Sequence, residues 1–176
     1  PPQLKVLEQA TRPLLRFLEK AHTEESLFLS TKSQGMEPSE EIAQEMLDIA
    51  IEQKGRAHCP YSKFRVGCCV QGSSGKLYGG CNVENASYGL TICAERVAIC
   101  NAVSNGETAI NSILVSTDVN DFKWCCGACL SCILEFGEEV VVISTTPDRR
   151  RQSKRIRELA PFAFSRADLE KPRVSC

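Results

Sequence analysis

Strand-like and helix-like patterns alternate along the second half of the chain, and this alternation limits the possible folds more than any other feature. A hairpin comes first, since the turn sequence Gly72-Ser73-Ser74-Gly75 separates two strand-like segments. The predicted elements are, in order, strands over 64–70 and 76–83, a helix over 93–103, a strand over 110–117, a helix over 127–136 and a strand over 140–145. A hairpin followed by alternating helices and strands is typical of a three-layer α/β domain with a mixed sheet.

A further helix is predicted before the hairpin. Ser39 is a preferred N-cap residue, and the two acidic residues after it lie where the helix dipole favours negative charge. Gly55 ends this helix, and its buried stripe consists of Ile42, Met46, Ile49 and Ala50. We expect the main domain, residues 39–176, to begin here.

Residues 1–38 are predicted to form an N-terminal extension. Leucines recur at helical spacing over residues 3–20, although Pro13 would divide them into one or two short helices. Residues 30–38 are rich in Ser, Thr, Gly and Pro, a composition typical of a linker.

Composition and charge exclude several classes of protein. Hydrophobic residues make up 43% of the 176 residues and charged residues 24%, which favours one folded domain over a disordered chain. The 21 Lys and Arg residues nearly balance 22 Asp and Glu residues, so no overall field attracts nucleic acid. Six basic residues do gather at 149–157, where we favour a solvated turn and edge strand over a nucleic-acid surface.

The sequence also indicates in which compartment the protein is expected. No apolar run is long enough for a membrane-spanning helix, and the N-terminus lacks a secretory core, so we expect a cytoplasmic protein. Eleven cysteines, an odd number in a chain of this length, favour buried thiols or metal ligands over a disulfide framework.

Three cysteines at predicted helix starts suggest a metal site. Cys126 and Cys129 form a CxxC where the helix dipole favours thiolates, although a redox pair is an alternative and Cys129 with Cys132 forms a second CxxC. We prefer Cys126 with Cys129 because they lie at the helix entrance. Cys93 begins another helix and precedes Glu95 by two residues. Since positions i and i+2 of a helix lie about 200° apart, both can serve one site only if Cys93 lies at the irregular entrance.

Three thiolates around Zn²⁺ leave a fourth position open, as in catalytic zinc sites. Glu95 could then act as general acid and base on a water molecule, which indicates metal-assisted hydrolysis. Arg96 could hydrogen-bond the thiolates and offset their charge, although an ordinary surface charge is the alternative.

These motifs carry a family resemblance. Residues 81–96, CNVENASYGLTICAER, followed by CGAC at 126–129, resemble the small tetrameric cytidine deaminases. The resemblance includes CPYSKFRVG at 59–67 and ELAPFAF at 158–164, and it covers roughly residues 39–170. It implies a three-layer α/β/α domain with a five-stranded mixed sheet, and hydrolysis of cytidine and deoxycytidine in pyrimidine salvage.

The resemblance also implies roles for individual residues. Cys93, Cys126 and Cys129 would hold one Zn²⁺ per subunit, and Glu95 would carry protons to N3 and to the departing ammonia. Phe64 would stack on the base, and the backbone around Ala94 would hold its polar edge. The ribose hydroxyls would be hydrogen-bonded by Asn82 and Glu84. Taken without the family, Phe64 is more typical of a core aromatic and Asn82 of a turn.

The implied assembly is a homotetramer, in which Tyr88 and Phe164 would reach a neighbouring subunit's site. The carboxylate of Glu84 would repel a phosphate, so we expect a nucleoside rather than a nucleotide substrate.

The alternative functions are a deaminase acting on RNA or single-stranded DNA, and a zinc module without turnover. The chain departs from the family pattern at Cys125, Leu130, Ser131 and Ser165.

Overall fold

The computed structural model describes residues 35–169. The chain divides into two units, Pro1–Lys32 and Ser33–Cys176, and the described residues belong to the second. The helices predicted over 3–20 and most of the predicted linker lie outside the described residues. The boundary at residue 38 therefore remains a prediction.

Five strands form one mixed sheet in the order β2-β1-β3-β4-β5. The only parallel pair in it is β3 with β4, and the other neighbouring strands run antiparallel. Their bounds are β1 Val66–Gly72, β2 Leu77–Cys81, β3 Ile110–Thr117, β4 Val141–Thr145 and β5 Arg151–Arg155. The predicted five-stranded mixed sheet is thus confirmed, and the predicted hairpin joins β1 to β2.

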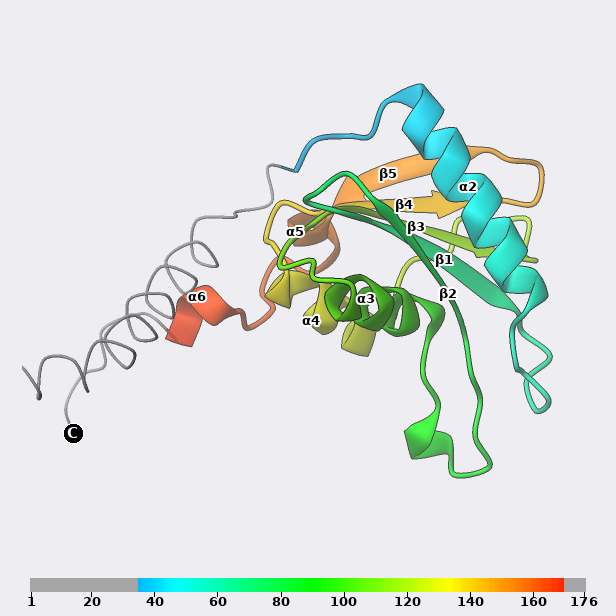
Figure 1. The fold of residues 1–176 in the computed structure, drawn as a ribbon. Coiled ribbons are helices and arrows are strands. Elements are labelled where there is room, and N and C mark those ends of the chain that lie inside the picture. The colour runs from blue at the N-terminus through cyan, green and yellow to red at the C-terminus, as the bar shows by residue number, and fades with distance from the viewer. Residues whose placement is uncertain (1–34, 170–176) are drawn as a thin grey trace, which may run out of the picture. The chain divides into compact units, whose positions relative to one another are not determined.

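Helices cover both faces of the sheet and complete the three layers (Figure 1). One face carries α2, whose N-cap Ser39 accepts a hydrogen bond from Ile42 N at 3.3 Å, as the sequence predicts. The opposite face carries α3 and α4. The helices in chain order are α2 Glu40–Gly55, the 3-10 turn η1 Tyr88–Leu90, α3 Ala94–Ser104, α4 Gly127–Glu135, and two short helices, α5 Ile156–Leu159 and α6 Arg166–Leu169.

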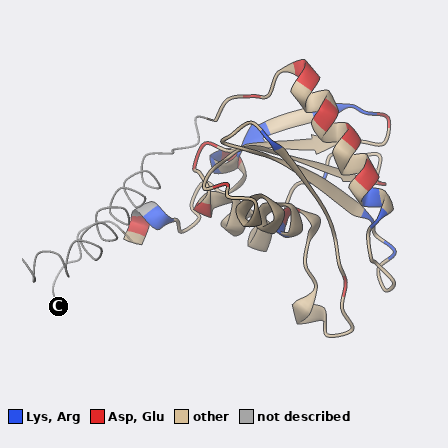
Figure 2. Cartoon of the chain, in the orientation of Figure 1, with Lys and Arg blue, Asp and Glu red and all other residues tan. Residues whose placement is uncertain are grey.

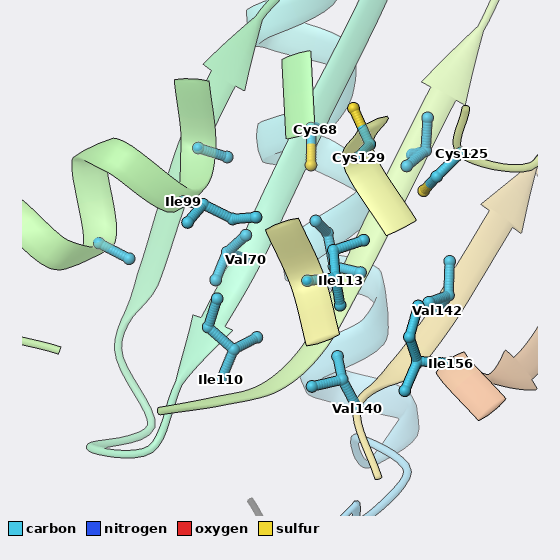
Figure 3. Packing of buried hydrophobic residues seen from close by; sticks show 14 of the residues in the cluster. Cys68, Val70, Ile99, Ile110, Ile113, Cys125, Cys129, Val140, Val142 and Ile156 are labelled. Atoms are coloured by element: carbon cyan, nitrogen blue, oxygen red, sulfur yellow. The ribbon is translucent and has the colours of Figure 1, made fainter. Parts of the chain in front are cut away.

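Two apolar clusters, one on each face of the sheet, make up the core. Side chains alternate between the faces, so Cys68 and Val70 of β1 pack toward α3 and α4 while Cys69 packs toward α2. The cluster under α3 and α4 includes Cys129 and Cys125 (Figure 3). Burial of this face therefore fixes the helices on which the predicted metal ligands lie.

Close packing of α3 against β2 depends on Gly80. A Cβ atom at this position would lie 2.4 Å from the backbone nitrogen of Ala98 in α3, closer than real Cβ contacts come. Because glycine lacks this atom, the helix backbone can approach the strand. The approach sets the position of the N-terminal turn of α3.

The basic run forms a turn and the edge strand β5, as predicted, but its last residue, Arg157, lies in the short helix α5. Figure 2 shows this basic strand near the acidic residues of α2. Each of the six basic side chains of the run at 149–157 has an acidic partner. The pairs are Arg149–Asp48, Arg150–Asp148, Arg151–Glu40, Lys154–Glu158, Arg155–Glu139 and Arg157–Glu138.

Among the described residues, no helix has the length and apolar character needed to cross a membrane.

Candidate metal and active site

The sulfur atoms of Cys93, Cys126 and Cys129 lie within 4.8 Å of one another, and we call this group the thiol centre. Cys93 is the N-cap of α3 and Cys126 the N-cap of α4, while Cys129 lies in the first turn of α4. The extended conformation of Cys93, φ −70° and ψ 154°, places it before the helix. Cys93 therefore lies at the irregular entrance that the sequence analysis requires if Cys93 and Glu95 are to serve one site.

The distance between the Cys93 and Cys126 sulfur atoms fits a tetrahedral zinc ion. Zn–S bonds of about 2.3 Å at tetrahedral angles place sulfur atoms about 3.8 Å apart, and the Cys93 and Cys126 sulfurs are 3.9 Å apart. Among the described residues this is the one group of three metal-ligating side chains close enough to bind an ion together. Cys132 is not part of the group, so the geometry favours the CxxC formed by Cys126 and Cys129.

The pKa values of the three thiols are shifted in different directions. Burial, followed by the charges of Glu95 and the neighbouring thiols, raises the pKa of Cys129. The pKa of Cys93 is also raised, because the effect of burial exceeds that of a hydrogen bond from Arg96, which lowers it. For Cys126 burial raises the pKa, but hydrogen bonds from Cys129 and Cys93 outweigh it and the pKa is lowered. A dication is the partner that would stabilise all three as thiolates.

Glu95 lies in the first turn of α3 and is only 6% exposed. Burial first, and the Glu95 carboxylate second, raise the pKa of the buried thiols of Cys68 and Cys125. The carboxyl group therefore lies close enough to act on the pKa of both thiols. Cys125, a departure from the family pattern, is an apolar core residue here and not a member of the metal-ligating group.

Arg96 supplies positive charge next to the sulfur atoms. Its Nη2 donates to the Thr91 carbonyl oxygen at 3.0 Å and to the Cys93 sulfur at 3.7 Å. Its Nε is buried without a hydrogen-bond partner among the described residues. The expected contact between Arg96 and a ligand thiol is thus present.

Of the residues expected to contact the nucleoside, Phe64, Asn82 and Glu84 lie on loops next to β1 and β2, and Ala94 is the first residue of α3. Phe64 is 42% exposed, and Asn82, which is buried, binds the backbone on both sides of Arg65. Asn82 Oδ1 accepts from Val66 N, and Nδ2 donates to the Phe64 carbonyl oxygen, both at 2.9 Å. Asn82 therefore holds the chain segment that carries Phe64.

Glu84 also binds this segment. Its carboxylate accepts hydrogen bonds from Tyr61 N at 2.9 Å and Ser62 N at 3.2 Å, and from the Ser62 hydroxyl. The Ser62 hydroxyl, ahead of the backbone donors, holds the pKa of the Glu84 carboxyl below its usual value. Glu84 therefore remains negatively charged at neutral pH. The sequence interpretation gave Ser62 no role, although the residue lies inside the motif that carries the resemblance.

Tyr88 and Phe164 are exposed within the single chain, by 75% and 67%. Tyr88 lies in η1, on the segment between β2 and α3 that extends away from the layers (Figure 1), and its ring meets the Tyr61 ring edge-on at 6.0 Å between centroids. Neither aromatic side chain is part of the packed core.

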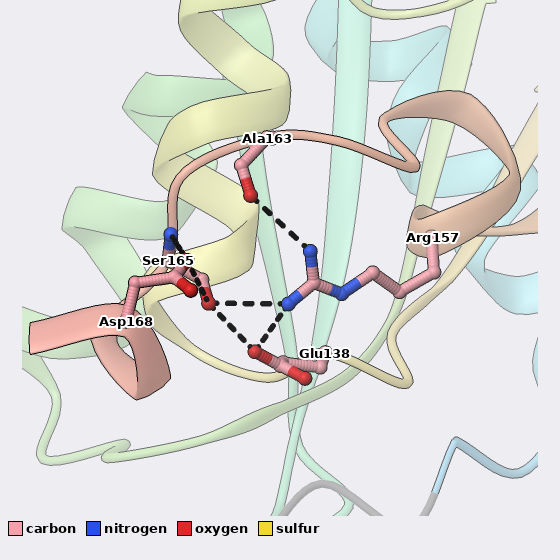
Figure 4. Close-up of polar contacts among 5 residues, drawn as sticks. All are labelled: Glu138, Arg157, Ala163, Ser165 and Asp168. Atoms are coloured by element: carbon pink, nitrogen blue, oxygen red, sulfur yellow. Dashed lines mark hydrogen bonds and ion pairs between the residues drawn. The ribbon is translucent and has the colours of Figure 1, made fainter. Parts of the chain in front are cut away.

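A polar cluster holds the segment that carries Phe164 (Figure 4). Arg157 donates to the Ala163 carbonyl oxygen at 3.3 Å and to the Ser165 hydroxyl at 3.1 Å, and it pairs with Glu138. The Ser165 hydroxyl donates to Glu138 at 2.8 Å, and Ser165 N donates to Asp168 at 3.0 Å. The unusual Ser165 thus takes part in fixing the segment.

Comparisons with known proteins agree with this geometry. A family model described as the cytidine and deoxycytidylate deaminase zinc-binding region matches residues 40–145. The chain is 44% identical to a probable cytidine deaminase of Dictyostelium discoideum, over 74% of this chain and 89% of that protein. It is 39% identical to a cytidine deaminase of Sporosarcina psychrophila, over 69% of this chain and 91% of that protein. The structure of a cytidine deaminase from Burkholderia pseudomallei superposes with a TM-score of 0.66 at 34% identity, covering 69% of this chain and 98% of that one.

Proposed function

The chain belongs to the cytidine and deoxycytidylate deaminase family, and we propose that it hydrolyses cytidine and deoxycytidine to uridine and deoxyuridine. One observation carries the proposal: three sulfur atoms meet at two helix tips with the buried Glu95 carboxyl in the first turn of one of those helices. Three ligands leave a position open for a reacting water molecule.

Cys93, Cys126 and Cys129 would hold the zinc ion. Zinc bound there would act as a Lewis acid that lowers the pKa of water to about 7. Glu95 would take one proton from the water and deliver it to N3 as the water oxygen bonds to C4 of the base. It would then move the second proton of that oxygen to the amino group, which leaves as ammonia when the C4–N bond breaks. Water and cytidine thus give uridine and ammonia with no net change at Glu95. The burial of Glu95 keeps its carboxyl away from bulk solvent.

Arg96 has a supporting role in this scheme. Three thiolates and one Zn²⁺ sum to −1, which weakens the metal as a Lewis acid. The Arg96 guanidinium, 3.7 Å from the Cys93 sulfur, offsets part of this charge. The N-termini of α3 and α4, from which two of the ligands project, add further positive potential.

The substrate contacts are proposals on the same basis. Phe64 would pack against the base, the backbone at Ala94 would hydrogen-bond its polar edge, and Asn82 and Glu84 would lie at the ribose. A negatively charged Glu84 disfavours a 5′-phosphate, so we expect little turnover of cytidine 5′-phosphate or its deoxy form. Comparable turnover of cytidine and its 5′-phosphate would contradict this assignment.

We also propose a homotetramer with one zinc ion per subunit, acting in pyrimidine salvage in the cytoplasm. The exposure of Tyr88 and Phe164 supports the assembly, because large aromatic side chains held at a surface favour a protein contact. In the tetramer these two rings would reach a neighbouring subunit's site.

The test is a near-ultraviolet assay of cytidine, deoxycytidine and cytidine 5′-phosphate, with metal analysis of the same sample. We expect turnover of both nucleosides and about one zinc per chain. An editing assay on RNA and single-stranded DNA is run alongside. Activity on polynucleotide alone would favour a deaminase that acts on RNA or single-stranded DNA. The acidic partners of the basic run at 149–157 argue against that alternative. Zinc without turnover of any substrate would favour the inactive zinc module.

A further inference from the structure

The backbone of Phe64 is held at both of its polar atoms by side chains. Its N–H donates to the Ser62 hydroxyl at 3.0 Å, and its carbonyl oxygen accepts from Asn82 Nδ2 at 2.9 Å. Neither bond belongs to a strand or helix, because β1 begins only at Val66. Two side chains therefore set the position of this residue.

The Ser62 hydroxyl joins this arrangement to Glu84. It donates to the Glu84 carboxylate and accepts from Phe64 N, so one oxygen connects the two residues. Because Glu84 is charged, the bond from the hydroxyl to it is charge-assisted and fixes the direction of the hydroxyl proton. That direction leaves a lone pair of the oxygen for the Phe64 N–H.

The backbone conformation of Lys63, which lies between Ser62 and Phe64, explains why these hydrogen bonds are needed. Lys63 has a φ of 58°, in the left-handed region that residues other than glycine seldom adopt. The turn is closed by a bond from Lys63 N to the Cys59 carbonyl oxygen at 3.1 Å. A conformation of this kind persists only where surrounding bonds fix it. The bonds made by Ser62 and Asn82 flank Lys63 and Phe64 and supply that constraint.

We propose that Ser62 is a positioning residue for the deamination reaction, acting through Phe64. By bridging Glu84 and the Phe64 backbone it fixes the angle at which the half-exposed ring meets the base. The inference rests on the proposed function, since it takes Phe64 as the ring that contacts the base. It assigns Ser62 no contact with the substrate.

Kinetics of Ser62→Ala, Ser62→Thr and Ser104→Ala test the proposal. Losing one hydrogen bond that orients the ring should lower kcat/KM for cytidine about 3- to 10-fold, chiefly through KM. Ser62→Thr keeps the hydroxyl and should restore most of the loss. Ser104→Ala, an exposed serine near the end of α3, is the matched control and should leave both constants unchanged. An unchanged KM in Ser62→Ala would overturn the proposal.

A double-mutant cycle with Phe64→Ala separates positioning from direct contact. If Ser62 acts through the ring, Ser62→Ala should have little further effect once the ring is gone. Equal fold losses in the two backgrounds would overturn the proposal, because they would mean that Ser62 acts without Phe64.

Amide hydrogen exchange provides a readout that does not need turnover. The Phe64 N–H should exchange faster in Ser62→Ala than in the parent protein or in Ser62→Thr, since its acceptor is missing. Unchanged exchange would contradict the bridge itself. If the parent protein failed to deaminate cytidine, the proposed function would fail, while faster exchange would still support the bridge.

Discussion

The thiol centre and the residues assigned to the substrate are held by different kinds of interaction. The thiol centre lies at the tips of α3 and α4, which pack on the sheet through buried apolar side chains. Phe64 and Phe164 are exposed residues on loops, and Tyr88 is exposed in η1. Side-chain hydrogen bonds position the segments of Phe64 and Phe164. Removal of a ligand from the first region should therefore affect metal binding and turnover together. Changes at the second should affect binding while the metal stays in place.

The largest expected effect follows removal of a ligand from the thiol centre. Cys129→Ala should lose zinc and reduce deamination to background, because two thiols cannot complete the site. A chelator should have the same effect on the parent protein, and added zinc should reverse it. Metal analysis and the nucleoside assay measure both results.

Cys132→Ala is the matched control for this prediction. Cys132 lies in the same helix and packs against the same apolar cluster, but it is not part of the metal-ligating group. It should keep zinc and most of the activity. If Cys132→Ala lost zinc while Cys129→Ala retained it, the ligand assignment would be wrong.

The next largest effect is expected at Glu95, which separates chemistry from metal binding within the same region. Glu95→Gln keeps the size of the side chain but removes its proton-carrying function, so kcat should fall about 10²- to 10⁴-fold. Zinc content should stay unchanged. Near-parental kcat in this variant would remove Glu95 from the mechanism.

A smaller effect is expected on the substrate side. Stacking of a base on an aromatic ring contributes about 1–3 kcal/mol, so Phe64→Ala should raise KM for cytidine without loss of zinc. Val103→Ala is the control, because it shortens an exposed apolar side chain that lies elsewhere, in α3. It should change neither KM nor zinc content. Loss of zinc in Phe64→Ala would show that the two regions are not independent.

The smallest effect is expected in the polar cluster around Ser165. Ser165→Ala removes hydrogen bonds to Glu138 and from Arg157, and we expect it to lower the free energy of unfolding by about 0.5–1.5 kcal/mol. Denaturant unfolding measures this change, and zinc content should stay constant. A more stable Ser165→Ala variant would contradict the role given to this hydroxyl.

The stability that this cluster contributes should depend on pH, and the direction follows from the pKa shift of Glu138. The Ser165 hydroxyl first, and Arg157 next, hold the pKa of Glu138 below its usual value. A lowered pKa in the folded state stabilises the fold above the unfolded pKa, and this contribution is lost as the pH falls through the folded pKa. The difference in stability between the parent and Ser165→Ala should therefore shrink on acidification below about pH 4.

Some interactions were not visible in the sequence because their partners are far apart along the chain. Glu107, buried at 7% exposure, binds Ser73, Ser74 and Tyr78, which lie in the hairpin 29 to 34 residues earlier. Nothing local marks Glu107 as different from a surface carboxylate. Asn82 is a similar case, since its pairing with Phe64 and Val66 follows from the way the loop returns beside β2.

The sequence by itself determined the order and type of the elements from α2 to β5, apart from η1, and the pattern of cysteines at helix starts, but it did not predict α5 or α6. These features are local, since periodicity, capping residues and turn residues lie within a few positions of one another. Only the tertiary structure decided that Cys93 meets Cys126 and Cys129, that Ser62 and Asn82 hold Phe64, and that Ser165 binds Arg157. Such contacts depend on strand register and on how closely each helix packs on the sheet, and these are set by burial of the whole core.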